Sequence, residues 1–210
     1  MSKVKLIWTT PDGEALITKM ARVSNPTNQN NVETAPKLLQ YLLKHKHFSP
    51  FEMVSACVEI ETTRDIARQI LRHRSFSFQE FSQRYAEATM FETGECRLQD
   101  TKNRQNSLLN GDRELANEWE RQQQLALQSS VDAYQWALHN GIAKEVARKV
   151  LPEGLTTSRM YMSGSLRSWL HYLQVRLDPS TQKEHREVAQ QIKVALQQHY
   201  PNILEIINEV

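Results

Sequence analysis

Three arginines stand four residues apart at positions 64, 68 and 72. Helical geometry puts residues at this spacing on one face, and each pair of like charges there costs about 0.2–0.5 kcal/mol unless anions neutralise it. Two interpretations are open. In the first, the arginines form a solvated helix face and pair with carboxylates, for which Glu61 and Asp65 are candidates. In the second, they form a site for an anionic ligand.

The residues that follow favour a ligand. Positions 72–85 hold three arginines, three serines, one histidine, one glutamate and four aromatic rings. Arginine forks bind phosphate bidentately, and aromatic faces suit planar heterocycles. The run has no Gly-rich turn of the kind that cradles a dinucleotide, so a dinucleotide here would be held by side chains. The pattern predicts a site for phosphorylated, ring-bearing ligands.

A nucleic-acid-binding module is the alternative from another class. The Arg64–Arg74 face would then hold the backbone, with Phe76, Phe78 and Phe81 as stacking platforms. The formal net charge is only +2, which is too small for a nucleic-acid coat or a polybasic membrane surface. We therefore expect local anion recognition, with no nucleic-acid and no membrane partner.

Protein nucleophiles are poorly supported. Cys57 lies on an expected strand and Cys96 in a polar linker, and both are interpreted as structural or incidental thiols. Their spacing gives no metal motif, and we expect no metal. Ser82 would need a base, and His73 is nine residues away; a phosphate-ligand role for Ser82 is preferred over nucleophilic attack.

Hydrophobic periodicity indicates the elements that must position these residues. The expected strands cover about 4–8, 54–60 and 156–162. The expected helices cover about 15–23, 38–44, 64–74, 113–138, 142–151, 165–175 and 182–199, with a short helical tail after Pro201. Residues 24–34 and 75–85 are expected to be loops, and 86–112 to be the least structured segment. The class is α+β: one helix-rich domain over 1–210 with a small antiparallel sheet. No apolar run is long enough to span a membrane or resembles a signal peptide, so we expect a cytoplasmic protein.

One motif is specific to a family. Arg72-His73-Arg74, seven further residues and then Ser82 resemble the signature of flavin-dependent thymidylate synthases, the ThyX family. Four other blocks resemble the family in its order, over about residues 20–190. They cover 21–24, 47–52, 145–152 and 166–176.

The resemblance implies the reductive methylation of dUMP to dTMP, with methylenetetrahydrofolate as carbon donor and NADPH-reduced FAD as hydride source. The flavin supplies the hydride, so no protein nucleophile is needed, and the protein contributes positioning and electrostatics. The resemblance also implies a homotetramer with sites assembled at subunit interfaces. A family member that has lost activity and only binds nucleotide is a further alternative.

Site residues are carried over one by one. FAD would be held by Ser24, Ser49, Glu52, Arg72, His73, Arg74, Glu80, Ser165, Arg167 and His171, with Arg167 and His171 supplied by a different subunit. The substrate dUMP would be held by Gln69, Arg72, Glu80, Phe81, Ser82, Gln83, Arg84, Arg148 and Arg176, and His47 and Tyr85 would lie near the folate and nicotinamide entrance.

Arg176 is expected to be the catalytic residue, which faces the uracil ring and favours its ionised form. Its other interpretation is a cation that caps the C-terminus of its helix. Four positions depart from the family pattern: Gln83, Ser165, His171 and Ser180. These departures bear on FAD affinity rather than on the reaction.

Overall fold

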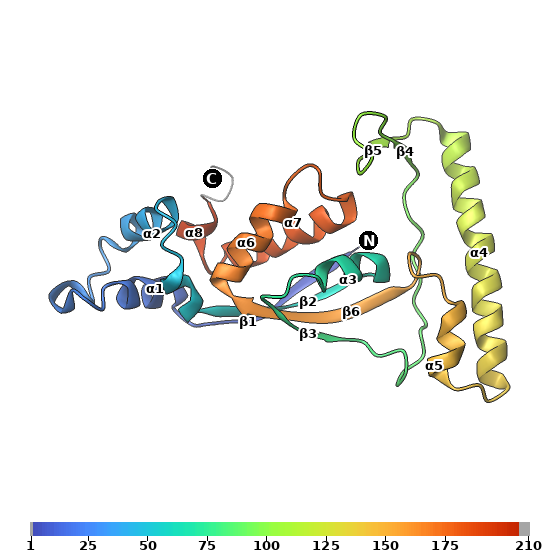
Figure 1. Cartoon of the computed structure of the whole chain (residues 1–210), viewed down its shortest axis with the longest axis horizontal. Coiled ribbons are helices and arrows are strands. Elements are labelled where there is room, and N and C mark those ends of the chain that lie inside the picture. Colours follow the sequence, from blue (N-terminus) through green and yellow to red (C-terminus); the bar gives the residue numbers. More distant parts are fainter. Residues whose placement is uncertain (1, 206–210) are drawn as a thin grey trace. The chain divides into compact units, whose positions relative to one another are not determined.

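The main sheet forms where the sequence alternates apolar and polar residues. In the computed structural model, which describes residues 2–205, four strands pair in the order β1-β2-β6-β3 (Figure 1). The strands are β1 Lys3–Thr9, β2 Ser55–Thr63, β6 Thr157–Ser165 and β3 Ser77–Glu80. The strands expected near 4–8, 54–60 and 156–162 are therefore confirmed.

Hydrogen bonds at the strand ends show the directions of the strands. The Arg64 amide donates to the Thr156 carbonyl at 2.9 Å, and the Leu166 amide donates to the Val54 carbonyl at 2.8 Å. The end of β2 thus lies beside the start of β6, and the start of β2 beside the end of β6, so the two strands are antiparallel. The expected class, a helix-rich α+β fold with a small antiparallel sheet, is confirmed, whereas a single domain over the whole chain stays a prediction.

The chain divides into two compact units, and the first comprises Ser2 and residues 61–72 and 80–160. Its helices are α3 Arg64–Ile70, α4 Arg113–His139 and α5 Lys144–Ala147, followed by the 3-10 turn η3 Arg148–Val150. Tyr134, Ala137 and Ala147 are buried together between α4 and α5. Gly141 follows α4 with φ of 74°, a conformation that suits glycine at a helix C-terminus. The helix expected over 142–151 is thus two short pieces rather than one.

Residues 86–112 are more ordered than the composition indicates. They contain an antiparallel pair, β4 Arg97–Gln99 and β5 Ser107–Leu109. The side-chain amide of Gln123 on α4 binds both backbone groups of Gly94, accepting at 2.7 Å and donating at 3.0 Å. Side-chain bonds of this kind depend on a distant helix, and local sequence does not reveal them.

The second unit comprises residues 3–60, 73–79 and the chain from 161 onward. Its helices are α1 Gly13–Ala21, α2 Ala35–Lys44, α6 Leu166–Arg176, α7 Lys183–Gln197 and α8 Pro201–Leu204, with 3-10 turns η1 Pro26–Asn28 and η2 Ser49–Met53. α7 packs against β1 and α6. Fully buried side chains form its core, among them Phe51, Ile60, Trp169, Tyr172 and Ile192.

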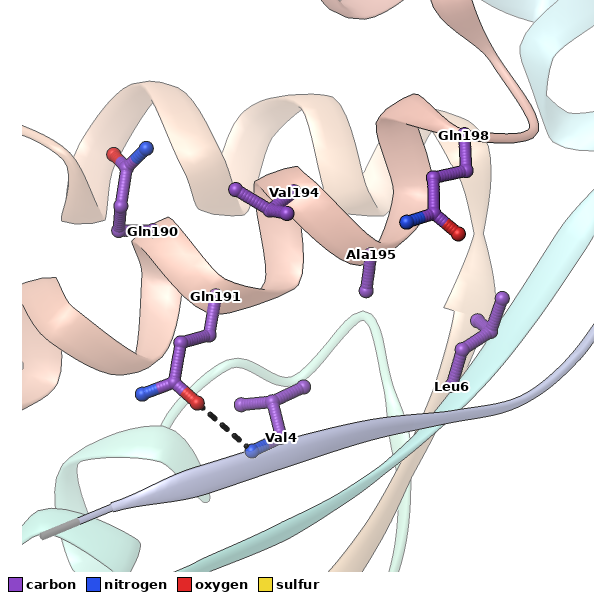
Figure 2. A pocket seen from close by; sticks show the side chains of 7 residues that line it. All are labelled: Val4, Leu6, Gln190, Gln191, Val194, Ala195 and Gln198. Carbon is purple, nitrogen blue, oxygen red and sulfur yellow. Dashed lines mark hydrogen bonds between the residues drawn. The ribbon is translucent and has the colours of Figure 1, made fainter.

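A pocket lies between β1 and α7 (Figure 2). Apolar side chains and glutamine amides line it, and Gln191 accepts a hydrogen bond from the Val4 amide at 3.1 Å. Its lining residues are Val4, Leu6, Gln190, Gln191, Val194, Ala195 and Gln198. None of them belongs to the expected site.

The segment around the arginine-histidine-arginine run departs most from expectation. The helix expected over 64–74 ends at Ile70, and β3 forms inside the segment expected to be a loop. Phe76 enters the core, 8% exposed, with its ring 4.6 Å from that of Trp169. A helix continued through residue 74 would carry Phe76 away from this core, so long-range packing overrides the local period. Among the described helices, none is long and apolar enough to cross a membrane.

Candidate active site

The expected substrate residues of the first unit gather around a turn after β3. The Ser82 carbonyl accepts hydrogen bonds from the amides of Tyr85 and Ala86, each at 3.0 Å. Phe81 is tied to β6 by its amide, which donates to the Arg159 carbonyl at 2.8 Å. The turn exposes Ser82, Arg84 and Tyr85, the last at 89%, and buries Gln83. The turn therefore presents an exposed hydroxyl, a cation and an aromatic ring.

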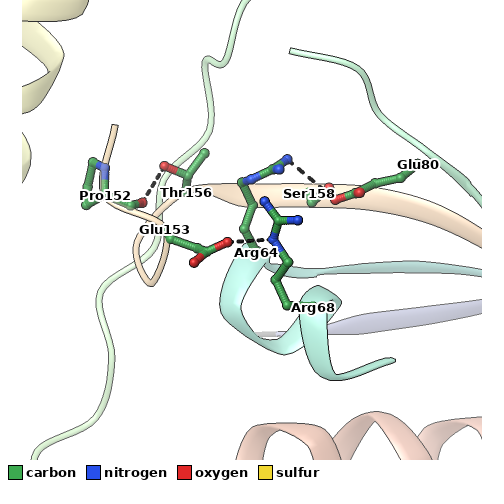
Figure 3. A network of polar contacts seen from close by, with 7 residues as sticks. All are labelled: Arg64, Arg68, Glu80, Pro152, Glu153, Thr156 and Ser158. Carbon is green, nitrogen blue, oxygen red and sulfur yellow. Dashed lines mark hydrogen bonds and ion pairs between the residues drawn. The ribbon is translucent and has the colours of Figure 1, made fainter. Parts of the chain in front are cut away.

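Glu80 is held from two sides before this turn. Its Oε1 accepts from Arg64 Nη1 at 3.4 Å and from the Ser158 hydroxyl at 2.7 Å, as Figure 3 shows. Arg68, one turn beyond Arg64 on α3, pairs with Glu153 at 2.7 Å. Arg64 and Arg68 thus have carboxylate partners elsewhere in the fold, as the first interpretation of the three-arginine pattern requires.

Arg72 lies outside α3 and differs from the other two arginines. It is exposed in the turn that follows the helix, where its amide contacts the Gln69 carbonyl at 3.3 Å. Within residues 2–205, Arg72, Arg74 and Arg148 form no ion pair. Three guanidinium groups without a protein carboxylate are suited to bind the phosphates of a ligand.

Arg84 pairs with α5, the short helix that precedes Arg148. Arg84 Nε pairs with Glu145 at 3.0 Å, and Arg148 follows Glu145 by three residues. The paired side chains are 68% and 52% exposed, and an exposed pair of this kind contributes about 0–1 kcal/mol to stability. Arg84 can therefore exchange Glu145 for a phosphate at little cost.

The expected cofactor residues of the second unit include a three-residue cluster. Glu52 on η2 accepts from the Ser165 hydroxyl at 2.5 Å and from Arg167 Nη1 at 2.7 Å. The bond from Ser165 and then the bond from Arg167 lower the pKa of Glu52. Ser165 also caps α6 by accepting from the Ser168 amide at 3.3 Å. A hydroxyl, an exposed cation and a carboxylate are thereby fixed at one helix end.

Arg176 contacts His73 directly. Arg176 Nε donates to His73 Nε2 at 2.8 Å across 103 residues of sequence. Burial first, and then the charges of Arg176 and His171, lower the pKa of His73 to about 4. His73 is therefore neutral at pH 7, as an acceptor of an arginine N–H must be. The alternative interpretation, in which Arg176 only caps its helix, does not account for this contact, because the side chain reaches a residue outside α6.

The remaining expected cofactor and entrance residues are exposed in the second unit. Ser24, Ser49 and His171 all lie at the surface. Arg22 holds the loop that carries Ser24 through the Asn31 carbonyl and the Thr34 hydroxyl. His47 lies in a cluster of exposed rings with Tyr41 and His45, whose centroids are 5.9 and 6.2 Å from it.

This donor set fits a flavin dinucleotide. Such a cofactor carries a pyrophosphate, hydroxyls and a planar ring, and it needs cations, hydroxyl partners and aromatic surface. Arg74 offers a guanidinium that forms no ion pair among residues 2–205, Ser49 an exposed hydroxyl, and Arg167 a cation whose ion pair is itself exposed. The residues present are thus of the kinds that FAD requires.

Four other sequence-based interpretations can be compared with the structure. Phe76 is buried, so it is not a stacking platform for nucleic acid. Burial raises the pKa of the Cys57 thiol, which makes it a poor nucleophile. In the described part of the chain, no three His, Cys, Asp or Glu residues are grouped to hold a metal ion. His73 Nε2, engaged by Arg176, is not available as a base for Ser82.

Sequence reasoning missed three residues behind the site. Ser158 holds Glu80, and Tyr172 and His185 lie behind His73 with ring centroids at 4.9 and 6.3 Å. His185 stands three, four and seven residues before Val188, Ala189 and Ile192, so the helical period already puts it on the buried face of α7.

Among the solved structures that share this fold are two of one enzyme. Both are of the UMP/dUMP methylase PolB from Streptomyces cacaoi, one bound with 5-Br dUMP and one with 5-Br UMP. Each is 27% identical to this chain, with TM-scores of 0.89 and 0.86. The match with the 5-Br dUMP complex covers 100% of this chain and 95% of the methylase chain. The match with the 5-Br UMP complex covers 99% and 94%, respectively. The fold is thus that of a nucleotide-methylase class, matched over its whole length.

The family follows from sequence relatives. The family model described as thymidylate synthase complementing protein, Thy1, matches residues 5–202. A flavin-dependent thymidylate synthase from Synechocystis sp. is 52% identical over 191 residues, which are 90% of this chain and 87% of the relative. A probable flavin-dependent thymidylate synthase of Paramecium bursaria Chlorella virus 1 is 45% identical over 200 residues, 94% and 91% of the two chains. The chain belongs to the Thy1 family, and the resemblance to flavin-dependent thymidylate synthases is confirmed.

Proposed function

We propose that this chain catalyses the reductive methylation of dUMP to dTMP, with FAD as cofactor and methylenetetrahydrofolate and NADPH as co-substrates. The observation that carries the proposal is the run from Arg72 to Arg84. Its exposed arginines Arg72 and Arg74 have no carboxylate partner among residues 2–205, while Arg64 and Arg68 just before it do. The chain belongs to the Thy1 family, and its relative from Synechocystis sp. is named for this reaction, as a flavin-dependent thymidylate synthase.

In this proposal the turn after β3 binds the nucleotide. The Ser82 hydroxyl and the guanidinium groups of Arg72, Arg84 and Arg148 supply donors for the phosphate of dUMP. Charge-assisted bonds of this type are about twice as strong as neutral ones. Glu80, locked by Arg64 and Ser158, fixes the start of the turn, and Gln69 and Gln83 complete the amide donors near it.

Arg176 is proposed as the group that acts on the uracil. With its Nε committed to His73, the two terminal nitrogens form a planar fork that can stabilise negative charge on the ring. FAD, when bound, supplies the hydride that completes the methyl group. His73, Arg74, Ser49, Glu52, Ser165, Arg167, His171 and Ser24 would hold that cofactor, and His47 and the exposed Tyr85 would contact the folate and the nicotinamide.

A homotetramer with shared sites is part of the proposal, and α4 supports it. Leu125 and Trp136 are 54% and 63% exposed and stand eleven residues apart, which is about three helical turns. They lie on one side of α4, and Trp136 is about 200° around the helix from buried Tyr134. These two exposed apolar side chains face away from the core between α4 and α5, and they suit contacts with another subunit. We further propose a single domain that works in the cytoplasm.

Genetic complementation tests the proposal. Cells that require thymidine should grow without it when they express this chain, and Arg176→Ala should abolish the growth. Arg159→Ala is the matched control, because Arg159 is exposed on β6 and has no assigned role. Failure of the wild-type chain to support growth, with the protein present and carrying flavin, would contradict the proposed reaction.

A further inference from the structure

Behind the His73–Arg176 contact, the second unit buries two further polar side chains. Tyr172 on α6 and His185 on α7 are both 0% exposed. Tyr172 OH and His185 Nε2 are 3.1 Å apart and share a hydrogen bond. Burying a histidine and a phenol costs desolvation free energy that apolar side chains avoid, so this pair calls for a role.

The His73 ring depends on its surroundings for its orientation. His73 lies in the turn between α3 and β3, outside any regular element. Tyr172 packs edge-on against its ring, with centroids 4.9 Å apart and an interplanar angle of 70°, while the His185 and Phe76 rings lie 6.3 and 6.5 Å away. Of these three, Tyr172 is the nearest, and His185 fixes the phenol of Tyr172.

The direction of the Arg176 bond restricts His73 to one state. An arginine Nε–H only donates, so His73 Nε2 must carry a lone pair and the ring proton must sit on Nδ1. The titratable groups that surround His73 are His171, Tyr172 and Arg176 of α6 and His185 of α7. Protonation of His73 Nε2 would turn this acceptor into a second donor, which cannot bond with Arg176 Nε–H.

We propose that Tyr172 and His185 are positioning residues: the His185–Tyr172 hydrogen bond holds the His73 ring as the acceptor of Arg176 Nε, and so sets the plane of the Arg176 guanidinium. This inference rests on the proposed function only for its effect on activity. Burial lowers the pKa of His185 to about 3, which keeps that residue uncharged beside Arg176.

The test uses NMR on the full chain with ¹⁵N-labelled arginine and histidine. Wild type should show one protected Arg176 Nε–H signal and an unprotonated His73 Nε2, assigned by their loss in Arg176→Lys and His73→Gln. Tyr172→Phe and His185→Leu should lose the protection of the Arg176 signal, and His185→Gln, which can still bond the phenol, should restore it.

Tyr134→Phe is the matched control. Tyr134 is equally buried and its hydroxyl accepts from the Ala88 amide at 3.2 Å, so this variant also loses a buried tyrosine hydrogen bond. It should leave the Arg176 signal unchanged. A Tyr172→Phe protein that folds and keeps the protected Arg176 signal would overturn the inference, whether or not the chain makes dTMP.

Activity gives the second readout. If Arg176 acts on the uracil, a misplaced guanidinium should slow dTMP formation about 10- to 100-fold in Tyr172→Phe and His185→Leu, with partial recovery in His185→Gln. If these variants lose the protected Arg176 signal but form dTMP at the wild-type rate, the positioning role stands and the role of Arg176 in the reaction is refuted. If the variants keep the protected Arg176 signal but form dTMP slowly, the positioning role is refuted while the role of Arg176 in the reaction stands.

Discussion

Acid should destabilise this protein through His185, and the structure sets the size of the effect. His185 is 0% exposed, and burial, followed by the charges of Arg176 and His73, lowers its pKa from 6.5 to about 3. In the unfolded chain the imidazole is free to take up a proton near pH 6.5. The unfolded state thus binds more protons below pH 6.5, so stability is full above that pH and falls as the pH drops towards the folded pKa.

The loss can be worked out for a shift from pH 7.5 to pH 5. An imidazole that titrates at 6.5 when unfolded and stays neutral when folded costs about 2 kcal/mol over this interval. The result hardly depends on the folded pKa once that value is below about 4. For a chain of this length, about 2 kcal/mol corresponds to a drop of about 4–8 °C in Tm.

Urea unfolding of wild type and His185→Leu at the two pH values measures this contribution, at one fixed protein concentration. His185→Leu should lose about 2 kcal/mol less than wild type on acidification, although it is less stable at pH 7.5 because Tyr172 loses its partner. His199→Leu, which removes an exposed histidine near the end of α7, controls for the loss of a histidine as such. Equal losses of stability on acidification in wild type and His185→Leu would show that protonation of His185 does not cause the acid destabilisation.

Other predictions follow from the site and its supports. Arg176→Ala should abolish dTMP formation while FAD stays bound, and near-normal turnover would contradict its role. Ser82→Ala should weaken dUMP binding, measured by calorimetry, more than it slows the chemical step; normal binding with no turnover would revive a nucleophilic serine. Gly164→Ala should cost about 1–3 kcal/mol in urea unfolding, because its Cβ would lie 2.5 Å from the Phe76 ring, whereas Gly154→Ala, with no atom within 4 Å, should cost far less. Trp136→Glu should reduce the subunit number in sedimentation and release FAD; an intact flavin-loaded tetramer would argue against the α4 contact.

Local periodicity predicted most elements of this fold. The alternation in β1 and β2, the long helical period of α4 and the Asn140-Gly141 stop were all readable, because each pattern repeats over several residues. The short strand β3 and the early end of α3 were missed. Four residues are too few for a clear period, and the burial of Phe76 is decided by the distant residue Trp169.

The site was predictable as a set of residues but not as a set of contacts. The family signature supplied Arg72, His73, Arg74 and Ser82 directly. The pairing of Arg176 with His73 joins residues 103 positions apart, and no local pattern encodes it. The same holds for His185, whose helical period indicated burial but not its partner on another helix.

Product analysis with the purified, FAD-supplemented protein tests whether the chain converts dUMP to dTMP. NADPH oxidation is followed with and without dUMP, and dTMP is then measured after methylenetetrahydrofolate is added. We expect flavin-dependent oxidation that dUMP stimulates, with dTMP formed only when the folate is present. Flavin-loaded protein that binds dUMP but forms no dTMP under these conditions would contradict it.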